Sequence, residues 1–380
     1  MSTLRDTWYE IDLDALSRNY QAVQHVAGPN VAMCPVLKAD AYGLGAVQSA
    51  RTFMSVGGVR YGAVACLSEA IELRESCADL PVLIMGYTPD RLLPVVAEHR
   101  IVPTIFELRQ AEILAASAPA DEPVPVHIKL DTGMNRLGLD DTKAGLETVC
   151  AIADLKQVRI EGLFSHLALA DQASDMNQFK RLQTFVEAVS KRGVSLGLIH
   201  VCDSIGMLRY PAFRLDMVRP GAILYGAPPL RDTCPLPIEV PFAFKTRIAR
   251  LRRLSAGEGV SYDYTWRATK EGALIATLPV GYADGFQRSF SNRGYVIVRG
   301  VRAPIVGLIC MDQAMIDVSA VAGVSAGDEV LLLGQSGPDS VPLLEAAQWA
   351  GSNRNAVLAG IGKRVPRVYA SEGTISEETT

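Results

Sequence analysis

Short apolar runs alternate with longer amphipathic segments along residues 31–218 of the chain. This alternation is typical of β-strand–α-helix repeats around a parallel sheet. Eight runs have the length of buried strands, and the segments between them repeat Leu and Ala at the three- and four-residue steps of a helix. The predicted strands are 31–38, 61–66, 82–86, 101–105, 124–131, 158–165, 196–201 and 215–218, and the predicted helices include 70–76, 91–98, 107–116 and 178–192. Eight repeats favour an α/β fold of the closed (β/α)8 TIM-type barrel class over an open doubly wound sheet, and no GxGxxG motif follows the first strand.

A proline-rich connection over residues 227–237 separates this region from a stretch of apolar runs set between Gly-rich turns. The change predicts a second, mainly β domain. We assign residues 1–232 to the barrel and 233–380 to the second domain, and leave open whether the first residues pack with the latter. The second domain is predicted to contain strands at 242–248, 274–280, 295–298, 303–309 and 329–333, one helix at 343–349, and a frayed tail after Ala370.

Composition narrows the functional classes. The 380 residues are 49% hydrophobic and 21% charged with a formal net charge of −4, which is typical of a soluble globular protein and not of a nucleic-acid binder. The seven cysteines show neither CxxC pairs nor the spacing of a zinc site, so we expect reduced thiols and no metal. Without an apolar run of signal-peptide or membrane-spanning length, the sequence predicts a cytoplasmic protein with no membrane partner.

Candidate chemistry lies where apolar strands end in polar residues, because strand C-termini meet at the mouth of a barrel. Lys38 ends the first strand, and a lysine held against apolar walls loses solvation, so its pKa falls and its amine can form a Schiff base. A lysine that extends to solvent is the alternative. Lys129 and Asp131 alternate along the fifth strand and Arg136 follows as a candidate anion clamp, although an internal salt bridge is equally compatible.

His166 ends the sixth strand, where it is either a catalyst or a packed core histidine. Ser204 follows the seventh strand and Gly221-Ala222 the eighth, where helix N-termini could bind phosphate or simply cap a turn. In the second domain, Tyr and Asp gather beside glycines in loops 259–264, 280–285 and 309–313, as ordinary turns also do.

Taken together, these segments closely resemble the alanine racemase family, pyridoxal 5'-phosphate (PLP) enzymes with a barrel and a C-terminal β domain. The motifs that carry the resemblance are VLKADAYG (36–43), DTGMNRLG (131–138), VRPG (218–221), GVSY (259–262), GYADG (281–285) and ICMD (309–312). Their order and intervals make chance similarity implausible. The resemblance implies an isomerase that interconverts L- and D-alanine, with a small amino-acid substrate.

The resemblance also implies a two-base site shared across a homodimer. Lys38 would hold PLP and act as one acid/base, and Tyr262 from the other subunit would act on the opposite face of the substrate. Arg136 would bind the phenolic oxygen of the cofactor and the substrate carboxylate. Lys129, carbamylated in some relatives, would position Arg136, and Met311 would offer a backbone N–H to the carboxylate.

The remaining roles implied by the resemblance concern the two ends of the cofactor and the substrate entrance. The phosphate would be held by Tyr42, Ser204 and the backbone around Gly221 and Ala222. Arg219 would face the pyridine nitrogen, where its permanent charge disfavours ring protonation, and would act through His166 on Tyr262. Tyr282 and Asp312 would line the entrance.

One segment departs from the family pattern. Where the family usually has Gly-Thr-x-Asn-Tyr-Glu, this chain has residues 351–356, GSNRNA, and counting back nine residues from Arg364 puts Asn355 at the tyrosine. Loss of that ring should enlarge and polarise the substrate pocket. We therefore hypothesise that serine, or a broader set of amino acids, is handled better than in a typical family member, because the substitution is similar to one in the family's serine racemases.

Three other functions fit parts of the sequence. A PLP-dependent decarboxylase shares the barrel and β domain but usually lacks a base like Tyr262. A non-catalytic PLP-binding protein is shorter than this chain. A Schiff-base aldolase without PLP would leave Ser204, Gly221 and Arg219 with no joint purpose.

Overall fold

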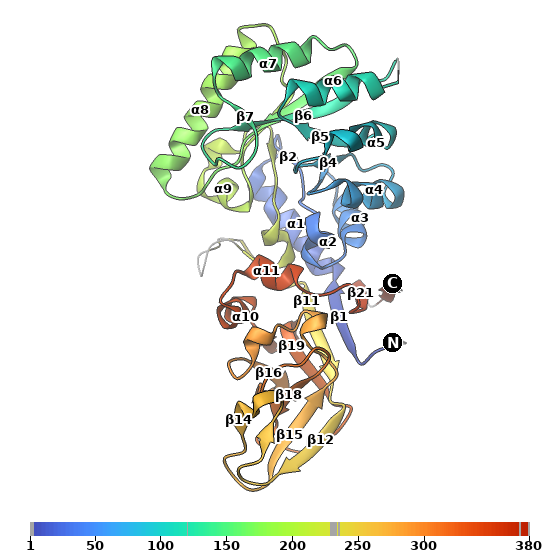
Figure 1. Ribbon diagram of the computed structural model, residues 1–380, viewed down its shortest axis with the longest axis vertical. Coiled ribbons are helices and arrows are strands. Elements are labelled where there is room, and N and C mark those ends of the chain that lie inside the picture. Colours follow the sequence, from blue (N-terminus) through green and yellow to red (C-terminus); the bar gives the residue numbers. More distant parts are fainter. Residues whose placement is uncertain (1–3, 120, 229–233, 235, 372–373, 379–380) are drawn as a thin grey trace.

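The computed structural model describes residues 4–119, 121–228, 234, 236–371 and 374–378. A barrel of parallel strands surrounded by helices occupies one end of the molecule and a β-rich domain the other, with β1 and β21 near the junction (Figure 1). The predicted barrel with a mainly β second domain is confirmed. The boundary predicted at residues 232/233 lies outside the described residues.

Eight parallel strands form a closed ring. They are β2 (Ala32–Met33), β3 (Gly62–Val64), β4 (Val82–Ile84), β5 (Val102–Ile105), β6 (Val124–Asp131), β8 (Val158–Phe164), β9 (Leu198–His200) and β10 (Met217–Val218). The strands from β3 to β9 pair in this order, β10 pairs with β2, and single bridges join Val36 to Ala63 and Asp203 to Arg219. Each strand lies inside one of the eight predicted runs, because their interiors are buried and the apolar signal is strong.

Helices cover the outside of the ring and alternate with the strands along the chain. They are α1 (Leu13–Ala27), α3 (Ala46–Val56), α4 (Leu67–Ser76), α5 (Leu93–Glu98), α6 (Leu108–Ser117), α7 (Lys143–Ala153), α8 (Gln172–Ser190) and α9 (Ser204–Arg209). Their buried faces explain the periodic Leu and Ala of the sequence; on α8, for example, Phe179, Leu182 and Phe185 are buried. No helix among the described residues is long and apolar enough to cross a bilayer.

The second domain contains a large sheet in which both ends of the described chain take part. Its order is β17-β16-β19-β11-β1-β21-β22, with β20 paired to β19, and β12, β15 and β18 form a separate three-stranded sheet. The bounds are β1 (Thr7–Asp12), β11 (Phe242–Arg247), β12 (Arg250–Leu254), β15 (Ala273–Leu278), β16 (Tyr295–Val298), β17 (Val301–Pro304), β18 (Ala314–Asp317), β19 (Glu329–Ser336), β20 (Asp339–Val341), β21 (Arg367–Ser371) and β22 (Thr374–Glu378). β1 lies between β11 and β21, so the first described strand belongs to this sheet.

Three predictions for the second domain are wrong. The tail after Ala370 is not frayed over residues 374–378, because its backbone pairs with β21 as β22. The strand predicted at 303–309 is β17, which ends at Pro304. The helix α10 (Leu343–Ala350) is followed by a second one, α11 (Arg354–Ala359), capped by the Asn353 side chain, which accepts a hydrogen bond from the N–H of Ala356 at 2.9 Å. A helix of six residues is too short to give a periodic signal in the sequence.

A buried asparagine ties the barrel to the segment that leads into the second domain. Asn19 on α1 donates to the carbonyls of Leu224 and Glu239 at 3.1 and 3.0 Å and accepts from the N–H of Glu239 at 2.8 Å. Because the Asn19 side chain is fully buried, water cannot take its place as the hydrogen-bond partner of these backbone groups.

We expect Asn19→Ala to lower the free energy of unfolding by about 3 kcal/mol, since three hydrogen bonds of about 1 kcal/mol each are lost. Urea unfolding followed by circular dichroism measures the change. Gln21→Ala, at an exposed position of the same helix, is the matched control. Equal midpoints for the two variants would contradict this role of Asn19.

Candidate active site

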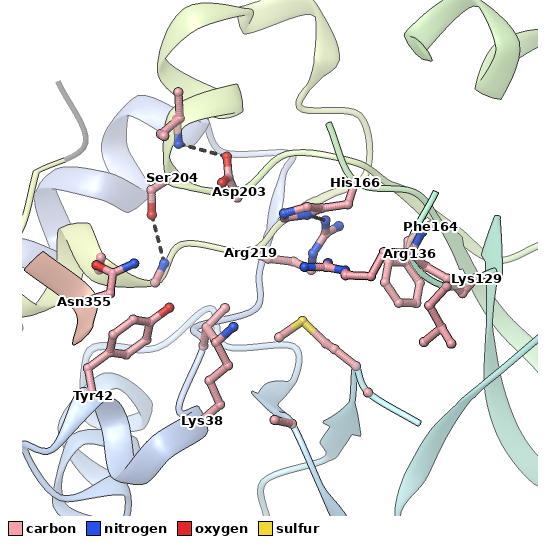
Figure 2. Close-up of a pocket in the computed structure, with 18 of the residues that line it drawn as sticks. Lys38, Tyr42, Lys129, Arg136, Phe164, His166, Asp203, Ser204, Arg219 and Asn355 are labelled. Carbon is pink, nitrogen blue, oxygen red and sulfur yellow. Dashed lines mark hydrogen bonds between the residues drawn. The ribbon is translucent and has the colours of Figure 1, made fainter. Parts of the chain in front are cut away.

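A cavity of about 560 Å³ opens at the carboxyl ends of the barrel strands. Ten residues predicted from the sequence line it: Lys38, Tyr42, Lys129, Arg136, His166, Ser204, Arg219, Gly221, Ala222 and Asn355. Figure 2 labels all of these except Gly221 and Ala222, and the labelled side chains converge on the cavity. Four further lining residues, Met85, Phe164, Asp203 and Arg354, were not predicted from the sequence. Asp203 follows an apolar run and Phe164 is the last residue of one, and these positions are the signal that could have identified them.

Lys38 stands at the start of a left-handed turn. The next four residues, Ala39 to Tyr42, have φ of 51–57°. This conformation costs about 1–2 kcal/mol for each residue with a Cβ, so the surrounding structure must hold it. The Glu69 carboxylate accepts from the N–H groups of Ala39 and Ala65 at 2.7 and 2.8 Å and thereby fixes the turn to the neighbouring strand end.

The Lys38 amine points into the cavity and not into bulk solvent (Figure 2). Burial of the ammonium and the positive charge of Arg136 both lower its pKa. A lysine in this state has a larger neutral fraction near neutral pH and is a better nucleophile and base.

A polar cradle lies at one end of the cavity. Ser204 Oγ accepts from the N–H of Gly221 at 2.9 Å, and a Cβ on Gly221 would lie 2.6 Å from the Tyr42 hydroxyl. Glycine is therefore required for the close approach of Tyr42. Asp203 does not face the cradle as a free acid, because its Oδ1 accepts from the N–H groups of Ile205 and Gly206 at the start of α9.

Arg219 is the buried cation of the cavity floor. Its guanidinium donates to the carbonyls of Ser165 and Val201, both at 3.0 Å, and lies 5.2 Å from the centre of the Phe164 ring. It also contacts Nδ1 of His166 at 3.1 Å and Nδ1 of His200 at 2.7 Å. Since a guanidinium has donors only, both imidazole nitrogens must accept.

His166 is consequently neutral, with its proton on Nε2. Burial and the nearby positive charge of Arg219 lower its pKa to about 3. His166 lines the cavity, so the sequence-based alternative of a histidine enclosed in the core is wrong.

Arg136 and Lys129 occupy the opposite side of the cavity. The loop that carries Arg136 is shaped by Asp131, whose carboxylate accepts from the N–H groups of Gly133, Asn135 and Arg136 at 2.7–3.1 Å. Asp131 therefore serves the loop and does not form the internal salt bridge considered from the sequence. Lys129 is buried and donates to the carbonyl of Leu130 at 2.8 Å, and burial lowers its pKa to about 8.

Four residues predicted for the site lie on the second domain, outside the cavity of their own chain. They are Tyr262, Tyr282, Met311 and Asp312, and the first three are 62%, 40% and 53% exposed. Two of their loops are joined by Ser261, whose hydroxyl donates to the carbonyl of Leu308 at 2.6 Å. The structure thus gathers these residues on one domain but does not bring them to Lys38 within one chain.

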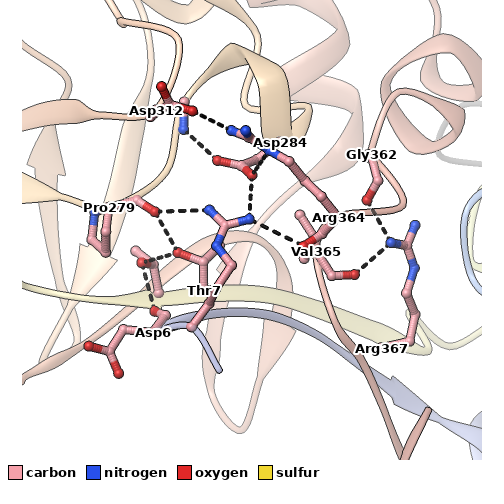
Figure 3. A network of polar contacts seen from close by, with 12 residues as sticks. Asp6, Thr7, Pro279, Asp284, Asp312, Gly362, Arg364, Val365 and Arg367 are labelled. Carbon is pink, nitrogen blue, oxygen red and sulfur yellow. Dashed lines mark hydrogen bonds and ion pairs between the residues drawn. The ribbon is translucent and has the colours of Figure 1, made fainter. Parts of the chain in front are cut away.

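A network of arginines fixes the loops around Tyr282 and Met311 (Figure 3). The buried carboxylate of Asp284 accepts from Arg5 and Arg364, both at 2.7 Å, and from the N–H of Gly281 at 3.0 Å. Arg364 also bonds the carboxylate of Asp312 at 2.7 Å. Arg364 therefore holds both loops, and Arg5, from near the other end of the chain, holds the loop of Asp284 as well.

Both halves of the chain match known families. The model "Alanine racemase, N-terminal domain" matches residues 11–229, and "Alanine racemase, C-terminal domain" matches residues 242–369. An alanine racemase of Desulfovibrio desulfuricans is 43% identical over 372 residues, which cover 96% of this chain and 98% of the relative. One of Desulforamulus reducens is 37% identical over 369 residues, 95% and 98% of the two chains.

Solved structures agree with these matches over the whole length. An alanine racemase of Clostridium difficile 630 superposes with a TM-score of 0.93 at 33% identity and covers 99% of this chain and 98% of its own. A structure from Bacillus anthracis, described as an alanine racemase with bound L-Ala-P, has a TM-score of 0.92 at 29% identity with the same coverage.

Buried neutral histidines predict a loss of stability in acid. The pKa values of His127 and His166 are lowered to about 3, and that of His200 lies well below its usual value. At all three positions burial is the largest cause, and the positive charge of Arg219 also lowers the pKa. An unfolded histidine binds a proton below about pH 6.5. The unfolded state therefore holds more protons than the folded state between about pH 6.5 and 3, and stability present above this window falls as the pH falls through it.

We expect each of these histidines to cost about 2 kcal/mol of unfolding free energy by pH 5, from about 1.4 kcal/mol per pH unit. Urea unfolding at pH 7 and pH 5 measures the loss. His166→Gln should reduce the difference in unfolding free energy between pH 7 and pH 5 by about 2 kcal/mol, the contribution expected of one histidine. His25→Gln, at an exposed position, is the matched control. A wild-type protein with the same stability at both pH values would refute the neutral state of the cluster.

Proposed function

The chain belongs to the alanine racemase family, and from this premise we propose that it is a PLP-dependent isomerase that interconverts L- and D-alanine. The observation that carries the proposal is one cavity that combines a lysine of lowered pKa, a polar cradle and a buried arginine. The names of the relatives do not favour the serine or broad-specificity alternative, nor a decarboxylase or a binding protein.

The donor set of the cavity fits PLP. Lys38 would hold the cofactor covalently, and Tyr42, Ser204 and the backbone at Gly221 and Ala222 would hold its phosphate. The cavity contains five basic side chains, Lys38, Lys129, Arg136, Arg219 and Arg354, against the single carboxylate of Asp203. This excess suits a ligand that carries a phosphate and a phenolic oxygen together with a substrate carboxylate. When bound, PLP supplies the electron sink that makes removal of the Cα proton accessible.

Racemisation requires a base on each face of the substrate, and we assign one to the cavity of a single chain. Lys38 is suited to the first face. Lys129 also lines that cavity, but with a pKa of about 8 it is mostly protonated at neutral pH, and its amine donates to the carbonyl of Leu130. Among the described lining residues, His166 is neutral with its Nδ1 bound to Arg219, the Tyr42 pKa is raised to about 12 by burial, and Asp203 is engaged at α9. His166 and Tyr42 therefore cannot accept a proton at neutral pH, and the Oδ1 of Asp203 is occupied by two backbone N–H groups.

The second base is proposed to be Tyr262 of another copy of the chain. Three facts support this proposal: Tyr262 is exposed, its loop is tied to that of Met311, and both lie outside their own chain's cavity. A two-fold homodimer would bring the second domain of each copy to the barrel mouth of the other and complete two identical sites. Met311 would then offer its N–H to the substrate carboxylate opposite Arg136, and Tyr282 and Asp312 would border the entrance.

Arg219 and His166 would tune both ends of this chemistry. Facing the pyridine nitrogen, the permanent charge of Arg219 would keep that nitrogen unprotonated and so limit the electron sink. By limiting the sink, Arg219 would favour return of the proton to Cα over transamination. Since Nδ1 of His166 accepts from Arg219, its Nε2–H would donate toward the Tyr262 oxygen and stabilise the phenolate.

Complementation tests the shared site. Lys38→Ala and Tyr262→Phe should each lose at least about 1000-fold in kcat, because each removes a proton-transferring group. After mixing under conditions of subunit exchange, about a quarter of all sites should contain both intact residues, and activity should recover in proportion. Lys38→Ala should also lose the absorbance band that reports PLP bound to a lysine. Failure of the mixture to recover while each parent stays dimeric would refute a site shared between subunits.

Asn355 offers a separate prediction about substrate preference. α11 places it on the cavity wall near Tyr42, where its amide leaves more room than a phenol ring would (Figure 2). We propose that Asn355→Tyr lowers kcat/KM for L-serine relative to L-alanine by about tenfold, since filling the space disfavours the larger polar side chain. The racemisation rates of both substrates give the ratio, and Asn355→Gln is the control that keeps the amide. An unchanged ratio in Asn355→Tyr would remove Asn355 from the determinants of specificity.

A further inference from the structure

Two buried histidines lie behind Arg219, outside the cavity lining. Nδ1 of His200 is 2.7 Å from Nη1 of Arg219, and Nε2 of His200 is 3.0 Å from Nδ1 of His127. Both side chains are fully buried, and His200 stacks on Phe164 with ring centroids 4.8 Å apart. The proposed chemistry uses neither of them.

The barrel is shaped to admit His127. Its register partner on β8 is Gly162, and a Cβ at that position would collide with the imidazole. The ring meets Tyr61 edge-on at 5.1 Å, so it reaches across the barrel interior from β6 toward the start of β3. The His127 ring therefore fits the barrel interior only because the neighbouring strand has glycine at position 162.

Donor and acceptor chemistry allows one proton arrangement in this line of groups. Arg219 has only donors, so Nδ1 of His200 carries no proton and its Nε2 does. That Nε2–H must donate to Nδ1 of His127, which leaves the remaining proton of His127 on its own Nε2. The reverse order would place an N–H of His200 against an N–H of Arg219.

The line ends at His127. Among the described residues, Nε2 of His127 is a buried atom without a hydrogen-bond partner. Thr104, its register partner on β5, also has a hydroxyl without a partner. No hydrogen bond within the described part of the chain therefore leads onward from His127.

Burial is the largest cause that keeps both rings neutral, because a charged imidazole would lose its hydration, and the surrounding charges act in addition. Arg60 and Arg219 oppose protonation of His127, and Glu161, hydrogen-bonded to the Tyr61 hydroxyl, favours it. Arg219 and Lys129 oppose protonation of His200, as does His127 beside it.

We propose that a series of hydrogen bonds runs from Arg219 through His200 to His127, with every donor on the side of Arg219, and ends at His127. His200 and His127 are positioning residues in this series. His200 holds the guanidinium in place and His127 fixes the tautomer of His200. The series orients the charge of Arg219 without providing a route for protons into the barrel interior. Its use in catalysis rests on the proposed function, but its proton arrangement does not.

The proton arrangement can be tested in the purified full-length protein. The chain has five histidines, so ¹⁵N-histidine labelling and single substitutions can assign every ring in ¹H–¹⁵N correlation spectra. We expect protonated Nε2 and bare Nδ1 in both His127 and His200, unchanged between about pH 5.5 and 8.5, across the ordinary histidine pKa of about 6.5. A proton on Nδ1 of either ring, or titration in this range, would overturn the proposal.

Paired substitutions test the positioning role. His200→Asn places an amide oxygen near the position of Nδ1 and keeps an acceptor for Arg219, whereas His200→Leu removes it. We expect His200→Leu to raise the PLP dissociation constant by at least about tenfold and to increase transamination per racemisation event, while His200→Asn stays within about threefold of wild type. Equal behaviour of the two variants would remove His200 from the positioning of Arg219.

Thr104→Val tests whether the series ends at His127. It removes a buried hydroxyl beside His127 with little change of volume and should leave the tautomers and PLP affinity unaltered. A shifted His127 signal would show that the series continues to Thr104 and would contradict an end at His127. If wild-type protein fails to bind PLP, the proposed function is wrong, yet the spectra still decide the proton arrangement.

Discussion

The burial of one permanent positive charge constrains the whole candidate site. An arginine cannot relieve its burial by losing a proton, so the protein must surround Arg219 with acceptors. Two strand-end carbonyls and two imidazole nitrogens do so. The neutrality of His166 and His200 follows directly, because a protonated nitrogen in either position would face a second donor. The guanidinium thus determines the proton state of groups that carry no charge themselves.

The same constraint extends to the lysines. Lys38 and Lys129 share the cavity with Arg136 and Arg219, and burial together with this like charge lowers both pKa values. A chain of net charge −4 therefore collects positive charge at one point of its surface. The positive charge of the cavity favours the binding of anions, and it also lowers the pKa values of the two lysines. The same arrangement of charge therefore serves both ligand binding and the nucleophilicity of the lysine amines.

The sequence was informative where burial imposes a pattern and uninformative where tertiary contacts override local preference. Eight apolar runs located the eight barrel strands, and the residues that follow their ends located Lys38, Arg136, His166 and Ser204 in the cavity. Tyr42 and Asn355 came from the resemblance to the family and not from the strand pattern. No local signal could indicate four left-handed residues after Lys38, because Glu69, distant in the chain, holds that turn. The pairing of β22 with β21 also depends on a partner strand. The link from His200 to His127 joins strands 73 residues apart and has no trace in either segment alone.

The second domain shows why a rigid scaffold matters for residues that act elsewhere. Tyr262 and Met311 lie on loops whose tips are exposed, and exposed loops are usually mobile. Here Asp284 is held by Arg5 from the start of the chain and Arg364 from near its end, and Arg364 also holds Asp312. The strand β1 further places the start of the chain inside the same sheet. If these loops complete the cavity of another copy, their geometry is best set before the two copies associate. Loops that became ordered only on association would lose conformational entropy at that step, and the dimer would bind more weakly. The ion-pair network fixes that geometry within each chain, so dimerisation would join two preformed halves of a site.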